Sequence, residues 1–344
     1  MTPTGLIVAL ETSQDVWEQA VSLFPEANFL QSWNWGVFEE RLGKQVFRLK
    51  VTHDGVFVGL CQAVYEPARR GSYLAVAGGP LCDWVQSPQV LAEMISELKR
   101  IGRELGCVFI RLRPQQINSP AIVAVAERLG LHKAPMHLTA DLTLQLDLTQ
   151  TLEEILSAMR KNTRAAIRKA ESMGITVNQT MDPAAIHNFY TEQVQVARRH
   201  RFVPFTEKFL TEQFSAFAQD HQVALFQSYS GADQLAAAFV IFYNGEAVYH
   251  YGVSTEANAK LPGSYACQWA AIQEAKLRGC TRYNFWGIAP EEERQHRFAG
   301  VSLFKRGFGG QEVAYLPARD IALSWKYQGT YWFERVRSKL RKLD

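Results

Sequence analysis

The chain has 344 residues, of which 47% are hydrophobic and 12% aromatic, so there is apolar surface for more than one core and two domains are expected. The 37 basic and 34 acidic residues leave a formal charge of only +3, which excludes a general polyanion-binding surface and leaves local basic patches to contact RNA or a diphosphate. No CxxC or HExxH spacing, signal peptide or membrane-spanning run is present in the sequence, so we expect a cytoplasmic protein without a metal site or a disulfide framework.

The first half of the chain predicts an antiparallel meander that leads into a β-α-β crossover. His53-Asp54-Gly55 is a tight-turn sequence between two β-rich runs, and Ser87-Pro88 opens a helix that Gly106 ends. The predicted elements are strands at 46–52, 56–64 and 73–77, a helix at 88–105, a buried strand at 107–112, a helix at 119–129 and a strand at 142–148.

The second half repeats this order, which indicates duplication of one mixed α/β domain. Asn244-Gly245 supplies the positive φ angles of a type I′ hairpin turn. The predicted elements are one long helix from 151 to 174, helices at 183–200 and 207–220, strands at 223–228, 235–243 and 247–251, a helix at 264–278 and a strand at 282–286.

We therefore predict an α/β (α+β) fold of two tandem acetyltransferase-like (GNAT) domains with mixed, largely antiparallel sheets. The first domain is expected at residues 1–148 and the second at 149–316. An aromatic and basic tail at 317–344 is expected to pack back on the first domain.

Four segments carry recognisable motifs in a fixed order along the chain. They are FLQSWNWG at 29–36, TRAAIRKAESMG at 163–174, YHYGVS at 249–254 with QWAAI at 268–272 and YNFWG at 283–287, and LFKRGFGG at 303–310. In this order they resemble the motifs of the Fem family (FemABX-type) of peptidoglycan bridge-forming aminoacyltransferases, which includes the lipid II:glycine glycyltransferases.

The resemblance implies a non-ribosomal aminoacyltransferase, an enzyme that forms an amide bond. Its donor would be aminoacyl-tRNA, and its acceptor the stem-peptide amine of a UDP-linked or lipid-linked muropeptide. The resemblance implies neither a cofactor nor a metal. The expected location stays cytoplasmic, with peripheral contact at the inner face of the membrane as an open alternative.

Attack of an amine on an aminoacyl ester requires alignment, and a cation or hydrogen-bond donors for the oxyanion and the leaving ribose oxygen. Lys305, at the family's lysine position beside Phe304, is the catalytic candidate, because a lysine in a Gly-rich terminal loop would otherwise be solvated. Arg199 and Tyr251 stand at positions that the family uses near the precursor, and Ser254 follows on the same strand.

Further candidates for substrate binding have structural alternatives. Arg160, Arg164 and Arg168 recur at i, i+4 and i+8 on the predicted helix and form a stripe that can hold phosphates or be an ordinary solvated face. Gln31 and Trp35 stand at the family's cleft entrance, with packing as the alternative.

The two basic clusters at 198–201 and 335–342 have the same ambiguity. The first suits either a precursor phosphate or a helix C-terminus, and the second suits tRNA, an anionic membrane or a solvated chain end.

Two positions depart from the family's pattern. Glu39 stands where better-known members have a lysine, which puts one diphosphate contact in doubt. Arg113 stands where a catalytic aspartate is proposed, and a guanidinium cannot act as a base. Either solvent or substrate removes the proton, or the base has moved, with Asp83 and Asp141 as unranked candidates; inactivity is the remaining alternative.

Two other functions compete with aminoacyl transfer. An acyl-CoA N-acyltransferase would bind a pyrophosphate at a helix start through an R/Q-x-x-G-x-G/A loop. The segment 260–265, KLPGSY, occupies the equivalent turn but places Tyr265 where a small residue is needed. The third hypothesis is a non-catalytic protein that binds muropeptide or tRNA, which Arg113 favours.

Overall fold

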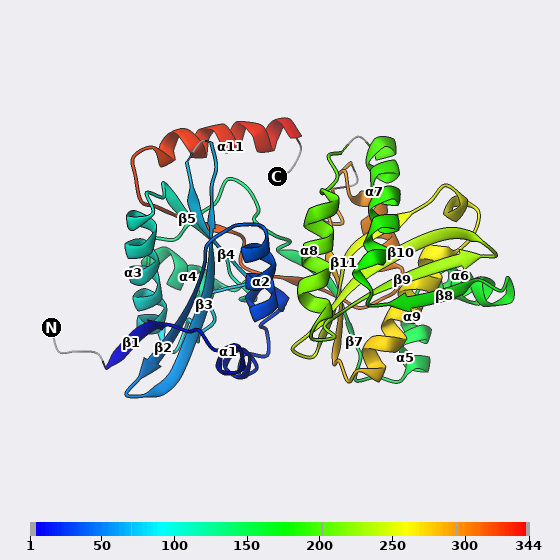
Figure 1. Cartoon of the computed structure of the whole chain (residues 1–344), viewed down its shortest axis with the longest axis horizontal. Helices are drawn as coiled ribbons and strands as arrows, with labels where there is room; N and C mark the ends of the chain where they lie inside the picture. Colours follow the sequence, from blue (N-terminus) through cyan, green and yellow to red (C-terminus); the bar gives the residue numbers. More distant parts are fainter. Residues whose placement is uncertain (1–4, 70, 201, 294, 342–344) are drawn as a thin grey trace. The chain divides into compact units, whose positions relative to one another are not determined.

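The structure, a computed structural model, describes residues 5–69, 71–200, 202–293 and 295–341. The chain forms two compact units, residues 1–141 with 314–344 and residues 142–313. Within the described residues each unit contains one seven-stranded sheet with helices on both faces (Figure 1).

The first unit is built on a sheet with the strand order β1-β2-β3-β4-β5-β14-β6. Neighbouring strands are antiparallel except β4 and β5, which are parallel and are joined through α3. Its elements are β1 (Leu6–Leu10), α1 (Gln14–Val21), the 3-10 turn η1 (Phe29–Gln31), α2 (Trp33–Arg41), β2 (Val46–His53), β3 (Val56–Glu66), β4 (Tyr73–Ala77), α3 (Pro88–Glu104), β5 (Phe109–Arg113), α4 (Pro120–Arg128), β6 (His132–Lys133), β14 (Arg319–Ala322) and α11 (Tyr327–Arg341).

The alternation of side chains along β5 separates the two faces of this sheet. Ile110 and Leu112 point into the core that the sheet forms with α3 and α4. Phe109 and Arg111 point to the opposite face, where α11 packs. Both faces of β5 are therefore buried, which explains why all five of its residues are shielded from solvent.

The second unit has the strand order β13-β7-β12-β11-β10-β9-β8. Here β11 and β12 are the parallel pair, joined through α9. Its elements are β7 (Leu142–Asp147), α5 (Leu152–Ala158), α6 (Lys161–Ser172), β8 (Thr176–Thr180), η2 (Pro183–Ala185), α7 (Ile186–His200), α8 (Glu207–Ala218), β9 (Val223–Ser230), β10 (Asp233–Tyr243), β11 (Glu246–Ser254), η3 (Ala257–Ala259), α9 (Gly263–Leu277), β12 (Arg282–Gly287), α10 (Ala299–Arg306) and β13 (Gln311–Ala314).

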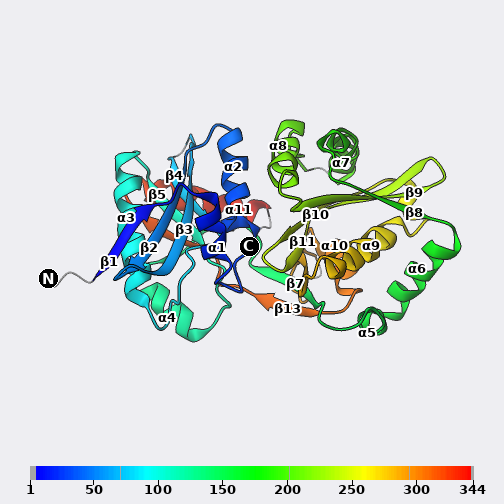
Figure 2. The ribbon, with the colours of Figure 1, turned by 60° about the horizontal axis from the view of Figure 1, so that its bottom comes forward.

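Figure 2 shows α7 and α8 on one face of this sheet, and α9 with α10 and α6 on the other. Residues of β10 alternate between these layers, since Phe239 packs on Phe189 of α7 and Phe214 of α8, whereas Ala238 and Val240 lie in the core under α9. The β10–β11 turn places Asn244 at φ 48° and Gly245 at φ 72°, which confirms the predicted type I′ geometry.

Both units therefore contain three antiparallel strands followed by a parallel strand that one helix connects (β2-β3-β4-α3-β5 and β9-β10-β11-α9-β12). This repeat confirms the predicted α/β class of two tandem acetyltransferase-like folds with mixed sheets.

One strand lies in a different sheet from the one the sequence suggested. The run at 142–148 was expected to close the first domain, but β7 pairs with β12 in the second sheet, through Asp147 opposite Arg282. The first sheet instead receives β14, from the tail, beside β5. Strand propensity at 142–147 does not specify a partner, because the pairing joins residues far apart in the sequence.

The predicted long helix from 151 to 174 is two helices. Met159 ends α5 with ψ 155°, and Arg160 is the extended residue before α6. The side chain of Met159 is buried in the core, and the backbone N–H of Arg160 donates to the carbonyl of Gly307. Packing thus breaks a continuous helical pattern, and Arg160 does not belong to the same helical stripe as Arg164 and Arg168.

Candidate active site

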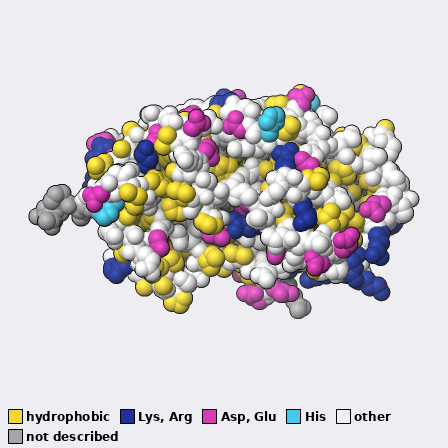
Figure 3. All heavy atoms as spheres, turned by 90° about the horizontal axis from the view of Figure 1, so that it is seen from below, with side chains coloured by type: hydrophobic (Ala, Val, Ile, Leu, Met, Phe, Trp, Pro, Cys, Tyr) yellow, Lys and Arg dark blue, Asp and Glu magenta, His cyan; other side chains and the backbone are white. Residues whose placement is uncertain are grey.

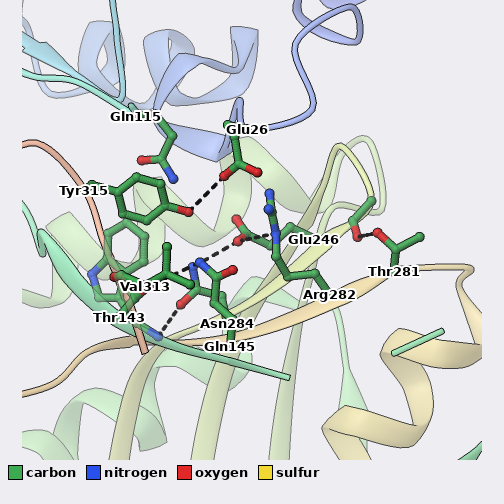
Figure 4. A network of polar contacts seen from close by, with 12 residues as sticks. Glu26, Gln115, Thr143, Gln145, Glu246, Thr281, Arg282, Asn284, Val313 and Tyr315 are labelled. Carbon is green, nitrogen blue, oxygen red and sulfur yellow. Dashed lines mark hydrogen bonds and ion pairs between the residues drawn. The ribbon is translucent and has the colours of Figure 1, made fainter. Parts of the chain in front are cut away.

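The parallel strands β11 and β12 pair over three residues each and then separate. The paired residues are 246–248 on β11 and 282–284 on β12. Figure 4 shows how polar side chains join the paired ends: buried Glu246 accepts a hydrogen bond of 2.9 Å from Asn284 and forms an ion pair of 3.0 Å with Arg282. This network fixes the register from which the two strands diverge.

Irregular backbone marks the place where the strands part. Trp286 has φ 63°, a conformation that costs energy for a bulky side chain and is concentrated at functional sites. On β11 the pairing with β10 skips His250, because Phe239 faces Tyr251 and the next residue, Val240, faces Tyr249. Bulges of this kind redirect side chains next to active sites.

Lys305 reaches into this divergence from α10. Its Nζ donates a hydrogen bond of 2.7 Å to the carbonyl of Gly287 and lies 5.7 Å from the centre of the Tyr249 ring. The lysine is 7% exposed, so it is not solvated. The sequence placed it in a Gly-rich loop, and that placement was wrong because α10 continues through Arg306.

Desolvation governs the charge of this lysine. Burial lowers the pKa of Lys305 to about 7, from an ordinary value of 10.5. Within the described part of the chain no carboxylate forms an ion pair with Lys305. A buried ammonium without a counter-ion is stabilised when negative charge develops beside it.

The structure brings Arg199 and Ser254 together. Arg199, an exposed residue on α7, donates through Nη2 to the backbone carbonyl of Ser254 at the end of β11, at 2.5 Å. Tyr251 lies three residues earlier on that strand, with its ring 5.0 Å from Phe205 and 5.5 Å from Phe239. These three predicted site residues therefore gather at the end of β11 that has separated from β12.

Tyr249 occupies the opposite face of β11 and is partly buried, and desolvation raises the pKa of its hydroxyl. Its Oη packs so closely on Gly252 that a Cβ there would lie 1.7 Å from the oxygen. Burial also lowers the pKa of His250 to about 3, so its imidazole is neutral at physiological pH.

Phe304 belongs to an aromatic cluster beside the lysine. Its ring lies 5.0 Å from Tyr265 and 5.3 Å from Phe308. Tyr265 therefore packs against α10 from the first turn of α9, where a pyrophosphate would approach in a CoA-binding fold. The backbone N–H of Ser264 in that turn already donates to the Asn258 side chain at 2.8 Å.

The predicted basic residues of α6 differ in environment. Arg164 donates through Nη1 to the carbonyl of Ser157 at 2.8 Å and to that of Met159, so it caps the end of α5. Arg168 is exposed. In Figure 3 lysine and arginine side chains gather on the side of the second unit where α6 lies.

Gln31 and Trp35 lie in the first unit. Gln31 is fully buried and joins two strands, because its Nε2 donates to the carbonyl of Ala77 at 2.7 Å and its Oε1 accepts from the backbone N–H of Gln62 at 2.8 Å. The backbone N–H of Trp35 bonds to the Ser32 hydroxyl at the start of α2, and its ring packs on Phe38.

The two departures from the expected motif pattern also lie in the first unit. Glu39 is buried and paired with Lys44 at 2.7 Å, and burial raises the pKa of its carboxyl. Arg113 is buried at the end of β5 and donates to Gln115 at 2.6 Å and to Thr139 at 2.5 Å.

Both alternative bases are engaged in local contacts. Asp83 is exposed and accepts hydrogen bonds from the backbone of Val85 and Gln86. Asp141 pairs with His137 at 2.9 Å. Among the residues described, no group of three or more His, Cys, Asp or Glu side chains is placed to hold a metal ion, and Arg201 of the basic cluster at 198–201 lies outside the described residues.

Sequence reasoning missed Trp286, His250 and Tyr249 as members of this site. All three lie within quoted motifs, but a positive φ at tryptophan and a bulge at histidine have no signature in residue type. Gly252 was the available signal in the sequence, because a glycine in a strand can mark a place where another group approaches the backbone too closely for a Cβ atom.

Comparison with known proteins gives one family model along most of the chain. The model of the FemAB family matches residues 12–121, 129–228 and 221–316. Aminoacyltransferase FemA of Staphylococcus epidermidis is 35% identical over 82 residues, and that of Staphylococcus aureus is 34% identical over 82 residues. Each match spans 24% of this chain and 20% of the relative's own length.

Solved structures resemble the fold over nearly the full chain. The crystal structure of FemX aligns with a TM-score of 0.84 at 15% identity, covering 95% of this chain and 99% of that one. A tandem GNAT protein from the clavulanic acid biosynthesis pathway aligns with a TM-score of 0.59 at 11% identity, covering 93% and 99%. At these identities the likeness concerns the fold.

Proposed function

The chain belongs to the FemAB family, and on that premise we propose that it is an aminoacyltransferase that joins an amino acid from aminoacyl-tRNA to the stem-peptide amine of a peptidoglycan precursor. The observation that carries the proposal is Lys305, a buried lysine without a carboxylate partner in the described chain, held where β11 and β12 separate. The match to relatives named aminoacyltransferase supports the reaction class.

The reaction has a simple balance of bonds. The acceptor nitrogen attacks the ester carbon, an amide C–N bond forms, the ester C–O bond breaks, and the proton lost by the amine ends on the ribose oxygen. Negative charge develops first on the carbonyl oxygen and then on the ribose oxygen, and the Lys305 ammonium stabilises both because its low-polarity surroundings do not screen it.

The pKa of about 7 gives Lys305 a further capability. An acid whose pKa lies near the operating pH gives up and recovers a proton readily. Lys305 can therefore donate a proton to the leaving ribose oxygen and regain it from the attacking amine. This route requires no carboxylate base, so it accommodates Arg113 at the position where an aspartate was sought.

The remaining predicted residues are assigned to binding. Arg199 and Arg168 are exposed cations in the second unit, suited to the phosphates of a nucleotide-linked or lipid-linked precursor or of tRNA. Tyr251 and Ser254, at the end of β11 that has separated from β12, and Phe304, next to Lys305 on α10, are assigned to the same substrates. Gln31 and Trp35 would act indirectly, by holding the first unit's strands and α2 in place.

The test uses the full chain with labelled, mixed aminoacyl-tRNAs and a panel of UDP-linked and lipid-linked muropeptides. Product masses should show one amino acid added to the stem peptide, which identifies donor and acceptor together. A single-turnover experiment separates the enzyme from a binding protein, since a non-catalytic homologue would retain both ligands without forming an amide. Absence of product with every donor and acceptor, from protein with a normal melting curve, would refute the proposal.

The acyl-CoA alternative makes a different prediction. Tyr265 and the Asn258–Ser264 hydrogen bond occupy the helix start that a pyrophosphate needs, so acetyl-CoA should show no micromolar affinity in calorimetry. Micromolar binding that competes with no muropeptide would favour the N-acyltransferase instead.

A further inference from the structure

The last described helix, α11, packs one of its faces against the sheet of the first unit. Tyr327 packs on Phe109 with ring centres 5.4 Å apart, and Glu334 forms an ion pair of 2.7 Å with Arg111. Thr330 and Ser338, on the same side of the helix, are buried. Spacing of three, four and four residues is that of a single helical face.

The opposite face exposes large apolar side chains to solvent. Trp332 is 58% exposed and Val336, one turn later, is 55% exposed. Trp325, in the turn that precedes the helix, is 84% exposed, and Phe333 is 38% exposed. Two tryptophans that remain this exposed indicate a contact surface, since an ordinary solvated helix face carries polar residues at such positions.

Positive charge accompanies this apolar face. The Arg335 guanidinium lies 5.4 Å above the Trp332 ring, and Arg337 follows two residues later. The segment 325–344 contains six lysines and arginines but only two acidic residues, and one of these, Glu334, is turned inward to Arg111.

A cationic hollow adjoins the flank of the helix. It has a volume of about 390 Å³, and Lys133, His137, Tyr331, Arg335 and Ser338 are among its lining residues. Two cationic side chains and two hydroxyl groups around one concavity suit a phosphate group.

We propose that the exposed face of α11 binds an anionic lipid membrane, with Trp325, Trp332 and Val336 entering the interface and Arg335 and Arg337 facing the phosphates. Tryptophan and arginine together are the side chains that favour the boundary between headgroups and acyl chains. Anionic lipid complements the positive charge of the segment, with each basic residue near the surface adding attraction. Val336, an aliphatic residue on this face, favours acyl chains over RNA bases, which stack on aromatic rings.

This mode of binding is peripheral. Over the part of the chain that the structure describes, no helix has the length and apolar character to cross a bilayer. The proposal does not depend on the proposed function, because vesicle binding is measured without donor or acceptor.

The experiment is co-sedimentation of the full chain with vesicles of phosphatidylcholine alone and of phosphatidylcholine mixed with phosphatidylglycerol. We expect binding to the anionic vesicles that weakens with added salt, and a blue shift of tryptophan fluorescence on binding. The double variant Trp325→Ser with Trp332→Ser should bind roughly tenfold more weakly or worse. The double variant Arg335→Gln with Arg337→Gln should lose the preference for anionic lipid.

Two matched variants control for the loss of an exposed apolar or basic group. Leu277→Ser removes a side chain that is 83% exposed in the second unit, and Arg103→Gln removes an exposed cation from α3; both should bind vesicles like the parent chain. Unchanged vesicle binding in the tryptophan double variant, with its melting curve intact, would overturn the proposal. So would a result in which the α11 variants lose tRNA binding or self-association while vesicle binding persists.

Discussion

Burial of an ammonium without a carboxylate partner is costly, so the pKa of Lys305 falls to about 7 although Nζ donates a hydrogen bond to Gly287. A surface lysine would cost the fold nothing, so its burial beside a strained Trp286 and a bulged His250 requires another reason. Such strain is tolerated where the chemistry benefits from it. We interpret the lysine as a preorganised cation whose surroundings have already lost their water.

The first prediction concerns the rate of transfer. Lys305→Met should lower kcat roughly a hundredfold or more, about 2.7 kcal/mol of transition-state stabilisation, with a much smaller change in KM. Lys305→Arg keeps the charge but replaces a compact donor with a planar fork, so it should rescue binding better than kcat. Steady-state kinetics with Lys99→Met as the control will distinguish this from a ground-state phosphate contact, for which KM would rise at constant kcat.

The second prediction is a pH dependence of stability. The pKa of Lys305 is about 7 in the folded protein, and its ordinary value is 10.5. Between these values the unfolded chain binds more protons than the folded one. The buried lysine therefore destabilises the fold fully below pH 7, and this destabilisation is relieved as the pH rises toward 10.5. Lys305→Met should therefore gain stability relative to the parent at pH 6 to 7, on the order of 4 kcal/mol, and lose that advantage near pH 10. Denaturant unfolding at several pH values measures it, and parallel curves for parent and variant would contradict it.

At the scale of elements, the junction of α5 and α6 separates two arginines that look equivalent in the sequence. Arg164 bonds to carbonyls at the end of α5, while Arg168, one turn on, is exposed. Arg164→Gln should lower the free energy of unfolding by about 1–2 kcal/mol, because it leaves those carbonyls without a charged donor. Arg168→Gln should leave the melting temperature unchanged, raise KM and flatten its salt dependence. If both substitutions raised KM equally and neither changed the free energy of unfolding, the Arg164 hydrogen bonds to α5 would contribute nothing to stability.

Most elements of the two sheets were predictable because their signals are local. Turn residues such as Asn244-Gly245 and the proline at the start of α3 act over a few positions, and the observed bounds of β4, 73–77, equal the predicted ones. The partner of β7 and the break before α6 were not predictable, since long-range pairing with β12 and the Gly307 contact decide them. The candidate site divides in the same way: the motif selects Lys305 as a catalytic candidate, but the burial of Lys305 depends on how α10 packs.

At the scale of the whole molecule, the first unit is assembled from two distant parts of the sequence. Arg111 and Asp320, 209 residues apart, form a bidentate pair with hydrogen bonds of 2.8 and 2.7 Å. Asp320 is fully buried and also accepts from the Tyr327 hydroxyl at 2.8 Å. The tail is therefore an internal component of the first unit.

The fourth prediction follows from that buried pair. Asp320→Asn leaves the buried Arg111 guanidinium with one carboxylate partner fewer. The free energy of unfolding of the first unit should fall by about 3–5 kcal/mol. Glu312→Gln removes the partner of Arg306 from a pair in which the glutamate is 37% exposed, and should cost less than about 1 kcal/mol. Chemical denaturation of both variants gives the comparison, and similar losses would mean that the tail is only loosely attached.

The discontinuous first unit also fixes an order of events during synthesis. Its sheet lacks β14 until residues 314–344 have been made, and the whole of the second unit, residues 142–313, is translated before them. At about 5–20 residues per second, those 172 intervening residues take roughly 10–35 s to translate. Throughout that interval the N-terminal part of the first unit has an unpaired β5 edge and an Arg111 without Asp320, so we expect the second unit to complete its sheet first.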